Sequence, residues 1–83
     1  MKLLYFAWVR QTLGRSEESF DPPAEVTTVA DLIAHLRDRG GAYAEALKET
    51  AAIRVAVNQV FAEADAPVRA GDEVAIFPPV TGG

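Results

Sequence analysis

The chain has 83 residues, a length at which a folded protein forms one hydrophobic core rather than two. Hydrophobic residues make up 49% and charged residues 24%, which is a globular rather than a disordered composition. A net charge of −4 with scattered basic residues disfavours a nucleic-acid binder, and the absence of cysteine excludes disulfides, thiolate zinc sites and a cysteine nucleophile.

Residues 2–10, KLLYFAWVR, are rich in aromatic and branched side chains and predict a first strand. Apolar residues occupy both alternating positions, so we expect this strand to be covered on both faces. A short second strand is expected near Glu17 to Phe20, and Asp21-Pro22-Pro23 ends it.

A helix is predicted to begin after Thr28, whose side chain can cap the first turn while Asp31 complements the helix dipole. Apolar residues then recur at helical spacing, and Gly40-Gly41 ends the helix. A second, shorter helix is expected at 42–49.

Three more strands follow from the alternation of apolar residues: Ile53–Val57, a short piece at 60–62 after the turn Asn58-Gln59, and Glu73–Phe77. Strands on both sides of one long helix predict an α+β roll, in which a mixed sheet of about five strands carries one main helix on one face. The last strand should lie beside the first in the middle of the sheet. We expect one domain over residues 1–77 and an extended, flexible tail over residues 78–83.

The side chains offer no recognisable catalytic constellation. His35 is expected on the solvated surface, and phosphate-binding, zinc-protease and nucleophile-elbow motifs do not occur. No apolar run approaches the length of a membrane span and the N-terminus does not resemble a signal peptide, so we expect a cytoplasmic protein that binds neither membrane nor nucleic acid. Several acids are predicted to serve only as a solubilising surface: Glu17, Glu18, Glu45, Glu49, Asp72 and Glu73.

The tail is the one part of the sequence that suggests chemistry. Its prolines favour an extended chain that projects from the sheet, and its glycines are thin enough to enter a narrow channel. A terminal carboxylate needs activation before a lysine or a sulfur nucleophile can displace the leaving group, and we expect this activation to be an acyl adenylate made from ATP. The residues concerned are Pro78, Pro79, Val80, Thr81, Gly82 and Gly83.

Three stretches together resemble a known family: VNQ at 57–59, AGDEVAIF at 70–77 and PPVTGG at 78–83. With YFAWVRQTLG at 5–14, they are similar to the ubiquitin-like β-grasp sulfur carriers that form the small subunit of molybdopterin synthase. The resemblance implies a β-grasp fold and a reactive Gly83. It covers nearly the whole chain.

The resemblance also implies a mechanism and a set of partners. A ubiquitin-activating-type adenylyltransferase, using ATP and magnesium that this chain does not itself bind, adenylates Gly83, and a sulfur donor protein supplies the sulfur of a terminal thiocarboxylate. The tail then enters the large synthase subunit, where two such sulfurs convert cyclic pyranopterin monophosphate into the dithiolene of molybdopterin. The large subunit holds the catalytic pocket, no metal site is expected on this chain, and two small and two large subunits form a heterotetramer.

Docking of such a tail requires an apolar surface at its root. Alternation along the last strand places Phe77 on the face opposite Val74 and Ile76, and Phe6 and Phe61 are expected to join it. We therefore predict that Phe6, Phe61 and Phe77 contact partner proteins.

Three alternatives remain at this point. A thiazole-biosynthesis sulfur carrier shares the fold and the tail chemistry, a ubiquitin-like modifier would join its terminus to a lysine, and a plain binding module would use only the sheet face. Loss of Gly82 and Gly83 would leave the function of a binding module intact.

Overall fold

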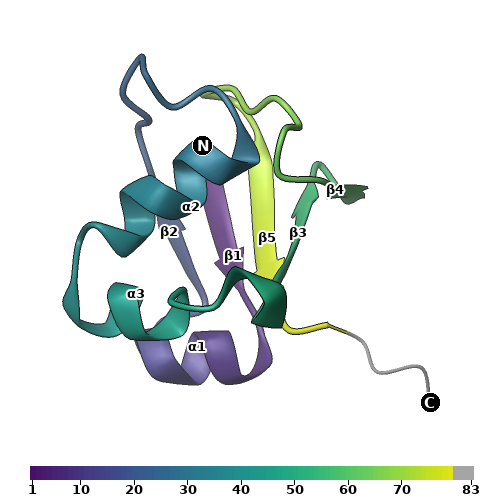
Figure 1. Ribbon diagram of the computed structural model, residues 1–83. Helices are drawn as coiled ribbons and strands as arrows, with labels where there is room; N and C mark the ends of the chain where they lie inside the picture. The colour runs from purple at the N-terminus through teal and green to yellow at the C-terminus, as the bar shows by residue number, and fades with distance from the viewer. Residues whose placement is uncertain (80–83) are drawn as a thin grey trace.

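The computed structural model describes residues 1–79 and consists of one sheet with helices on one face and at one end (Figure 1). The strands are β1 (Lys2–Tyr5), β2 (Glu17–Ser19), β3 (Arg54–Val57), β4 (Val60–Ala62) and β5 (Glu73–Phe77). The helices are α1 (Ala7–Leu13), α2 (Val29–Arg37), α3 (Gly41–Ala46) and the short 3₁₀ helix η1 (Thr50–Ala52).

The five strands form a mixed sheet in the order β2-β1-β5-β3-β4. β1 and β5 are parallel neighbours at its centre, with Leu3 opposite Val74, and the other pairs are antiparallel. This arrangement confirms the predicted α+β roll and the central position of the last strand. Because β1 and β5 run in the same direction, the chain leaves both strands at the same end of the sheet.

The predicted first strand is wrong in its second half. β1 ends at Tyr5, Phe6 remains extended, Ala7 has a φ of 52°, and residues 7–13 form α1. Gly14 closes this helix with a φ of 75°, a left-handed conformation that favours glycine. The strand propensity of residues 2–10 therefore led to a wrong prediction for residues 7–10. Gly14 was the one feature of the sequence that indicated the end of a helix.

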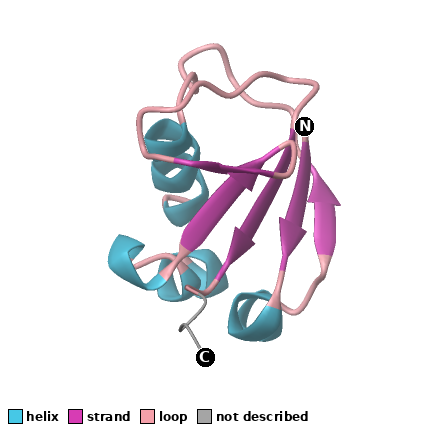
Figure 2. Ribbon diagram, turned by 90° about the vertical axis from the view of Figure 1, so that its right-hand side faces the viewer, coloured by secondary structure: helices cyan, strands magenta, loops and turns pink. Residues whose placement is uncertain are grey.

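Only one face of the sheet is covered by helices. Leu3 and Tyr5 of β1 face α2 and are buried with Val74 and Ile76 of β5. Leu4, on the opposite face, is only partly buried. The expectation of a first strand covered on both faces is therefore wrong, because the apolar residues that suggested it lie partly on α1. Figure 2 shows the helices on one side of the sheet and at its end.

α2 begins with the cap predicted from the sequence. The Thr28 hydroxyl accepts a hydrogen bond from the Asp31 backbone N–H at 3.2 Å, and the Asp31 carboxylate accepts one from the Thr28 N–H at 3.2 Å. The backbone N–H of Thr27 also donates to Asp31, at 3.1 Å, and these hydrogen bonds lower the pKa of that carboxyl.

As predicted, a break at Gly40-Gly41 separates α2 from a second helix, but this second helix is shorter than the expected range 42–49. Gly40 and Gly41 both have positive φ, at 75° and 54°. α3 ends at Ala46 rather than at 49, and its neighbour Leu47 is buried. His35, expected on the solvated surface, is only partly exposed because its ring lies 5.4 Å from that of Phe20.

Candidate functional site

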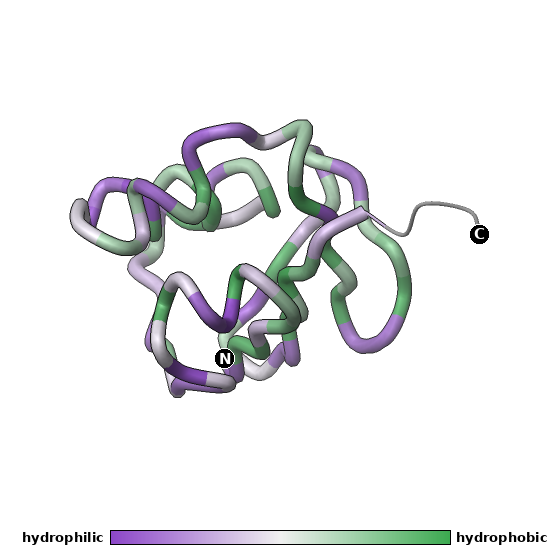
Figure 3. The backbone as a smooth tube through the Cα atoms, turned by 90° about the horizontal axis from the view of Figure 1, so that it is seen from below, coloured by the Kyte–Doolittle hydropathy of each residue, from purple (hydrophilic) through white to green (hydrophobic). Residues whose placement is uncertain are grey.

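The root of the tail lies where β5 ends, at Phe77. Residues 78–79 lead away from the sheet at the periphery of the molecule (Figures 1 and 3), and both prolines are partly exposed. Val80, Thr81, Gly82 and Gly83, which carry the predicted chemistry, lie outside the described residues.

The open face of the sheet carries the predicted docking residues. In register across the five strands, the side chains on this face come from Phe61, Ala56, Ala75, Leu4 and Glu17. Phe77 lies two residues beyond Ala75 on the same face. Because Ala56 is small, the rings of Phe61 and Phe77 approach one another across β3, and their centroids are 5.8 Å apart.

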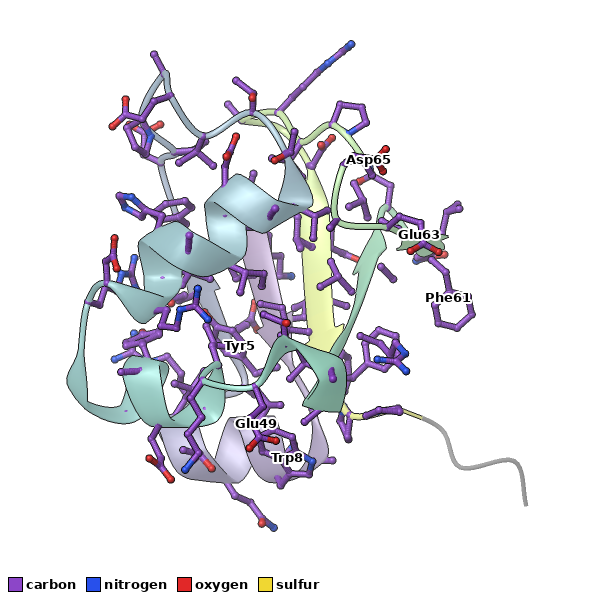
Figure 4. The ribbon with its side chains drawn as sticks, in the orientation of Figure 1. Tyr5, Trp8, Glu49, Phe61, Glu63 and Asp65 are labelled. Carbon is purple, nitrogen blue, oxygen red and sulfur yellow. The ribbon has the colours of Figure 1, made fainter. Side chains whose placement is uncertain are left out.

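Phe61 and Phe6 are far more exposed than most large apolar side chains. Phe61, on the edge strand β4, is 76% exposed and points away from the molecule in Figure 4, where Glu63 is the nearer of the two labelled acids. Phe6 is 47% exposed and follows the end of β1; its N–H donates to the Ile76 carbonyl at 3.2 Å. Phe6 therefore lies beside the end of β5, the strand that ends with Phe77.

A groove of about 880 Å³ begins at this aromatic pair and runs between α2 and β3. Val29 and Ile33 of α2 and Val55 of β3 contribute apolar walls, and the two arginines Arg37 and Arg54 also line the groove. The groove was not predicted from the sequence, because its walls come from elements that are distant along the chain.

A cluster of polar side chains centred on Glu18 lies between β2 and α3. Its carboxylate accepts hydrogen bonds from the Tyr5 hydroxyl at 2.6 Å, the Tyr43 hydroxyl at 2.9 Å, Arg39 at 3.0 Å and Arg15 at 2.8 Å. Since the carboxylate is surrounded by donors within the chain, we interpret the cluster as structural. The prediction that Glu18 is a solvated surface acid is wrong, because these donors come from four separate elements and loops.

The cluster changes the titration of its members. Burial acts to raise the pKa of Glu18, but hydrogen bonds from Tyr5, Tyr43 and Arg39 outweigh it, so the pKa lies below its ordinary value of 4.5. Burial, together with the Glu18 carboxylate, raises the pKa of Tyr5 well above 10.0. Both groups therefore keep a single charge state near neutral pH.

The described part of the chain contains neither a candidate metal site nor a membrane-spanning helix. Within residues 1–79, no cluster of three or more His, Asp or Glu side chains could hold a metal ion. The helices of this region are all too short and too polar to span a membrane.

Comparisons with known proteins agree on one family. The model of the ThiS family matches residues 3–83. The chain is 41% identical, over 100% of its length and 99% of the relative's, to the molybdopterin synthase sulfur carrier subunit of Escherichia coli (strain K12).

Solved structures of similar proteins share the fold. A Pyrococcus furiosus protein, described as a candidate molybdopterin converting factor, subunit 1, superposes with a TM-score of 0.76, at 35% identity and 95% coverage of both chains. SAMP1 from Haloferax volcanii gives a TM-score of 0.74, at 29% identity, over 100% of this chain and 98% of its own. The comparisons confirm the predicted ubiquitin-like fold.

Proposed function

The chain belongs to the ThiS family, and we propose that it is the sulfur carrier subunit of a molybdopterin synthase. The observation that carries this proposal is the 41% identity to a curated subunit of that name over the whole of both chains. Two further curated relatives, at 35% and 32% identity, have the same name. A thiazole-biosynthesis carrier and a protein modifier are therefore not favoured.

In the proposed reaction, Gly83 is the residue that carries sulfur. Its carboxylate attacks the α-phosphate of ATP on a ubiquitin-activating-type adenylyltransferase, which holds magnesium, and pyrophosphate leaves. A sulfur nucleophile at the oxidation level of sulfide, supplied by a donor protein, then attacks the acyl carbon of Gly83; the bond to AMP breaks, AMP leaves, and a thiocarboxylate remains. Two such sulfurs are transferred to cyclic pyranopterin monophosphate to form the dithiolene of molybdopterin.

The tail is proposed to deliver this group into the large synthase subunit. Pro78 and Pro79 restrict the backbone to extended conformations, which favours projection from the end of β5. Val80 and Thr81 add length, and Gly82 and Gly83 present no side chains to the walls of a narrow pocket. The catalytic side chains of the transfer step are assigned to the large subunit.

The docking surface is proposed to be the aromatic residues Phe6, Phe61 and Phe77. Exposed aromatic side chains beside a groove are typical of protein interfaces, because their burial contributes large apolar areas at a low cost in conformational entropy. The exposure of Phe61 and Phe6 and the groove beside Phe77 support this assignment. The proposed assembly contains two small and two large subunits.

The test is an intact-mass measurement of the terminal residue. The protein is incubated with the adenylyltransferase, ATP, magnesium and a sulfur donor, and we expect one oxygen of Gly83 to be replaced by sulfur. A variant that lacks Gly82 and Gly83 should remain unmodified but still bind the large subunit. Adducts to lysine side chains without any thiocarboxylate would contradict the proposal and indicate a protein modifier.

A further inference from the structure

Trp8 is an exposed tryptophan outside the docking surface described above. It lies on α1 and is 38% exposed, whereas its neighbour Val9 is fully buried and anchors the helix. Trp8 lines a groove of about 250 Å³ between α1, the end of α3 and the segment that connects α3 to β3. The other residues of this groove are Thr12, Glu45, Ala46, Lys48, Glu49 and Ala52.

The charges in this groove leave one carboxylate available. Lys48 forms an ion pair with Glu45 at 3.0 Å, whereas Glu49 forms no ion pair with any residue in the range 1–79. Glu49 is exposed, and Figure 4 shows it next to Trp8. An indole ring and an unpaired carboxylate therefore share one open groove.

A ring and a carboxylate together bind an arginine elsewhere in this same molecule. Arg39 lies 4.7 Å from the ring centroid of Tyr43 and 5.3 Å from that of Phe20, and its guanidinium donates to Glu18 at 3.0 Å. A guanidinium stacks on an aromatic face while its N–H groups bond to a carboxylate. Trp8 and Glu49 offer the same two groups to an arginine from outside the chain.

The groove lies at the end of the molecule from which the tail leaves. α1 follows β1, the tail follows β5, and these two strands are parallel neighbours. α1 also contacts β5, and Phe6 at the start of α1 bonds to Ile76. A protein that accepts the tail thus faces α1 as well as the Phe61–Phe77 pair.

We infer that Trp8 and Glu49 bind an arginine side chain of the large synthase subunit, on the α1 side of the tail root. The inference rests on the proposed function. It extends the docking surface beyond Phe6, Phe61 and Phe77 and gives it a charged contact. The net charge of −4 favours a partner with a basic surface, and the exposed Glu49 carboxylate provides a local acidic group for it.

The experiment compares the affinity of full-length variants for the large subunit of the same organism by calorimetric titration. We expect Trp8→Ala and Glu49→Gln each to weaken binding about 2-fold to 5-fold. The double variant should lose less than the product of the two effects, because both side chains hold one guanidinium. Added salt should lower the affinity of the wild-type protein for the large subunit more than it lowers the affinity of Glu49→Gln.

Glu25→Gln is the matched control, because Glu25 is an exposed acid in the loop between β2 and α2, at the opposite end of the molecule (Figure 1). The affinity of Glu25→Gln for the large subunit should equal that of the wild type. Glu49→Gln alters no buried group, so a loss of affinity in this variant is not an effect of unfolding. For Trp8→Ala, a thermal unfolding measurement shows whether the variant is folded at the temperature of the titration.

Unchanged affinity of both variants would overturn the inference, and so would a loss of adenylation with unchanged binding of the large subunit. If these results appear while the wild type still acquires sulfur at Gly83 and binds the large subunit, the proposed function stands and only the arginine site fails. A wild-type protein that neither acquires sulfur nor binds the large subunit would overturn both.

Discussion

Glu18 lies on an edge strand of three residues, yet its side chain is only 11% exposed. The hydroxyl of Tyr5, which is itself buried, donates to it, as do Tyr43 of α3 and Arg39 of the α2–α3 connection. One carboxylate thus joins β1, β2 and the α2–α3 region. Because buried polar groups are costly when they lose their partners, the stability of the fold should depend on this residue.

We predict that Glu18→Ala lowers the free energy of unfolding by about 2–3 kcal/mol at pH 7, because it leaves the buried Tyr5 hydroxyl without its acceptor. The stabilisation by Glu18 is fully present above its ordinary pKa of 4.5, since its pKa is lowered in the folded state. It is lost as the pH falls through the lowered value. Urea unfolding at pH 7 and below pH 4.5 should therefore show a difference between wild type and variant that shrinks with acidification.

Glu17→Ala is the control for this measurement. Glu17 is the neighbouring acid on β2, and its ion pair with Lys2, at 3.2 Å, is more than half exposed. Such surface pairs contribute little, so we expect a change below about 0.5 kcal/mol. Equal losses in the two variants would show that the donors around Glu18 contribute no particular stability.

At the scale of the element, the β3–β4 hairpin depends on two residues with left-handed backbone conformations. Asn58 has a φ of 51° and Gln59 a φ of 69°. The Asn58 side chain donates to Asp72 at 3.0 Å and accepts from the Glu73 N–H at 3.0 Å. The turn therefore also holds the start of β5 in register with β3.

We predict opposite effects for substitutions at these two adjacent positions. Asn58→Ala should lower the free energy of unfolding by about 1–2 kcal/mol, because it removes both side-chain hydrogen bonds and the tolerance of asparagine for positive φ. Gln59→Gly should raise it by about 0.5–1 kcal/mol, because glycine adopts this φ without strain and the exposed glutamine side chain is not needed. Thermal unfolding of both variants tests this, and destabilisation by Gln59→Gly would contradict the strain argument.

At the scale of the whole molecule, one face of the sheet is packed against helices and the other is open, and the open face carries the proposed docking residues. α2 covers the face that carries Leu3 and Ile76. The opposite face is open, and Phe61 on that face is exposed to solvent. The parallel pairing of β1 and β5 then places α1, Phe6 and the tail root at one end. The proposed docking residue Phe6 and the root of the tail therefore lie at the end of the sheet from which β5 leaves.

We predict that Phe61→Ala weakens binding of the large subunit at least about 10-fold without lowering stability, because this side chain is already 76% exposed in the free protein. Val60→Ala is the control. Val60 is 68% exposed on the same strand, but its side chain points to the other face of the sheet. Calorimetric titration measures both affinities, and equal affinities for Phe61→Ala and the wild type would exclude Phe61 from the docking surface.

Most of the fold could be predicted from local patterns. The α2 cap, the turn at Asn58-Gln59 and the alternation along β5 each depend on a few neighbouring residues, and all three occur in the structure. The prediction of a strand was wrong from residue 7 onward for a physical reason. Aromatic and branched residues favour strands only where a partner strand is available, and here the chain turns at Ala7 after Tyr5 has paired with Ile76.

The mixed roll, the family and the reactive role proposed for Gly83 could all be predicted from the amino-acid sequence, because they depend on short motifs and on alternating patterns of neighbouring residues. Four other features became visible only in the folded chain: the covered face of β1, the approach of Phe61 and Phe77 over Ala56, the donors around Glu18, and the groove that Trp8 and Glu49 share. Each of these relations joins residues far apart along the chain, and it exists only once strand order and helix packing are established.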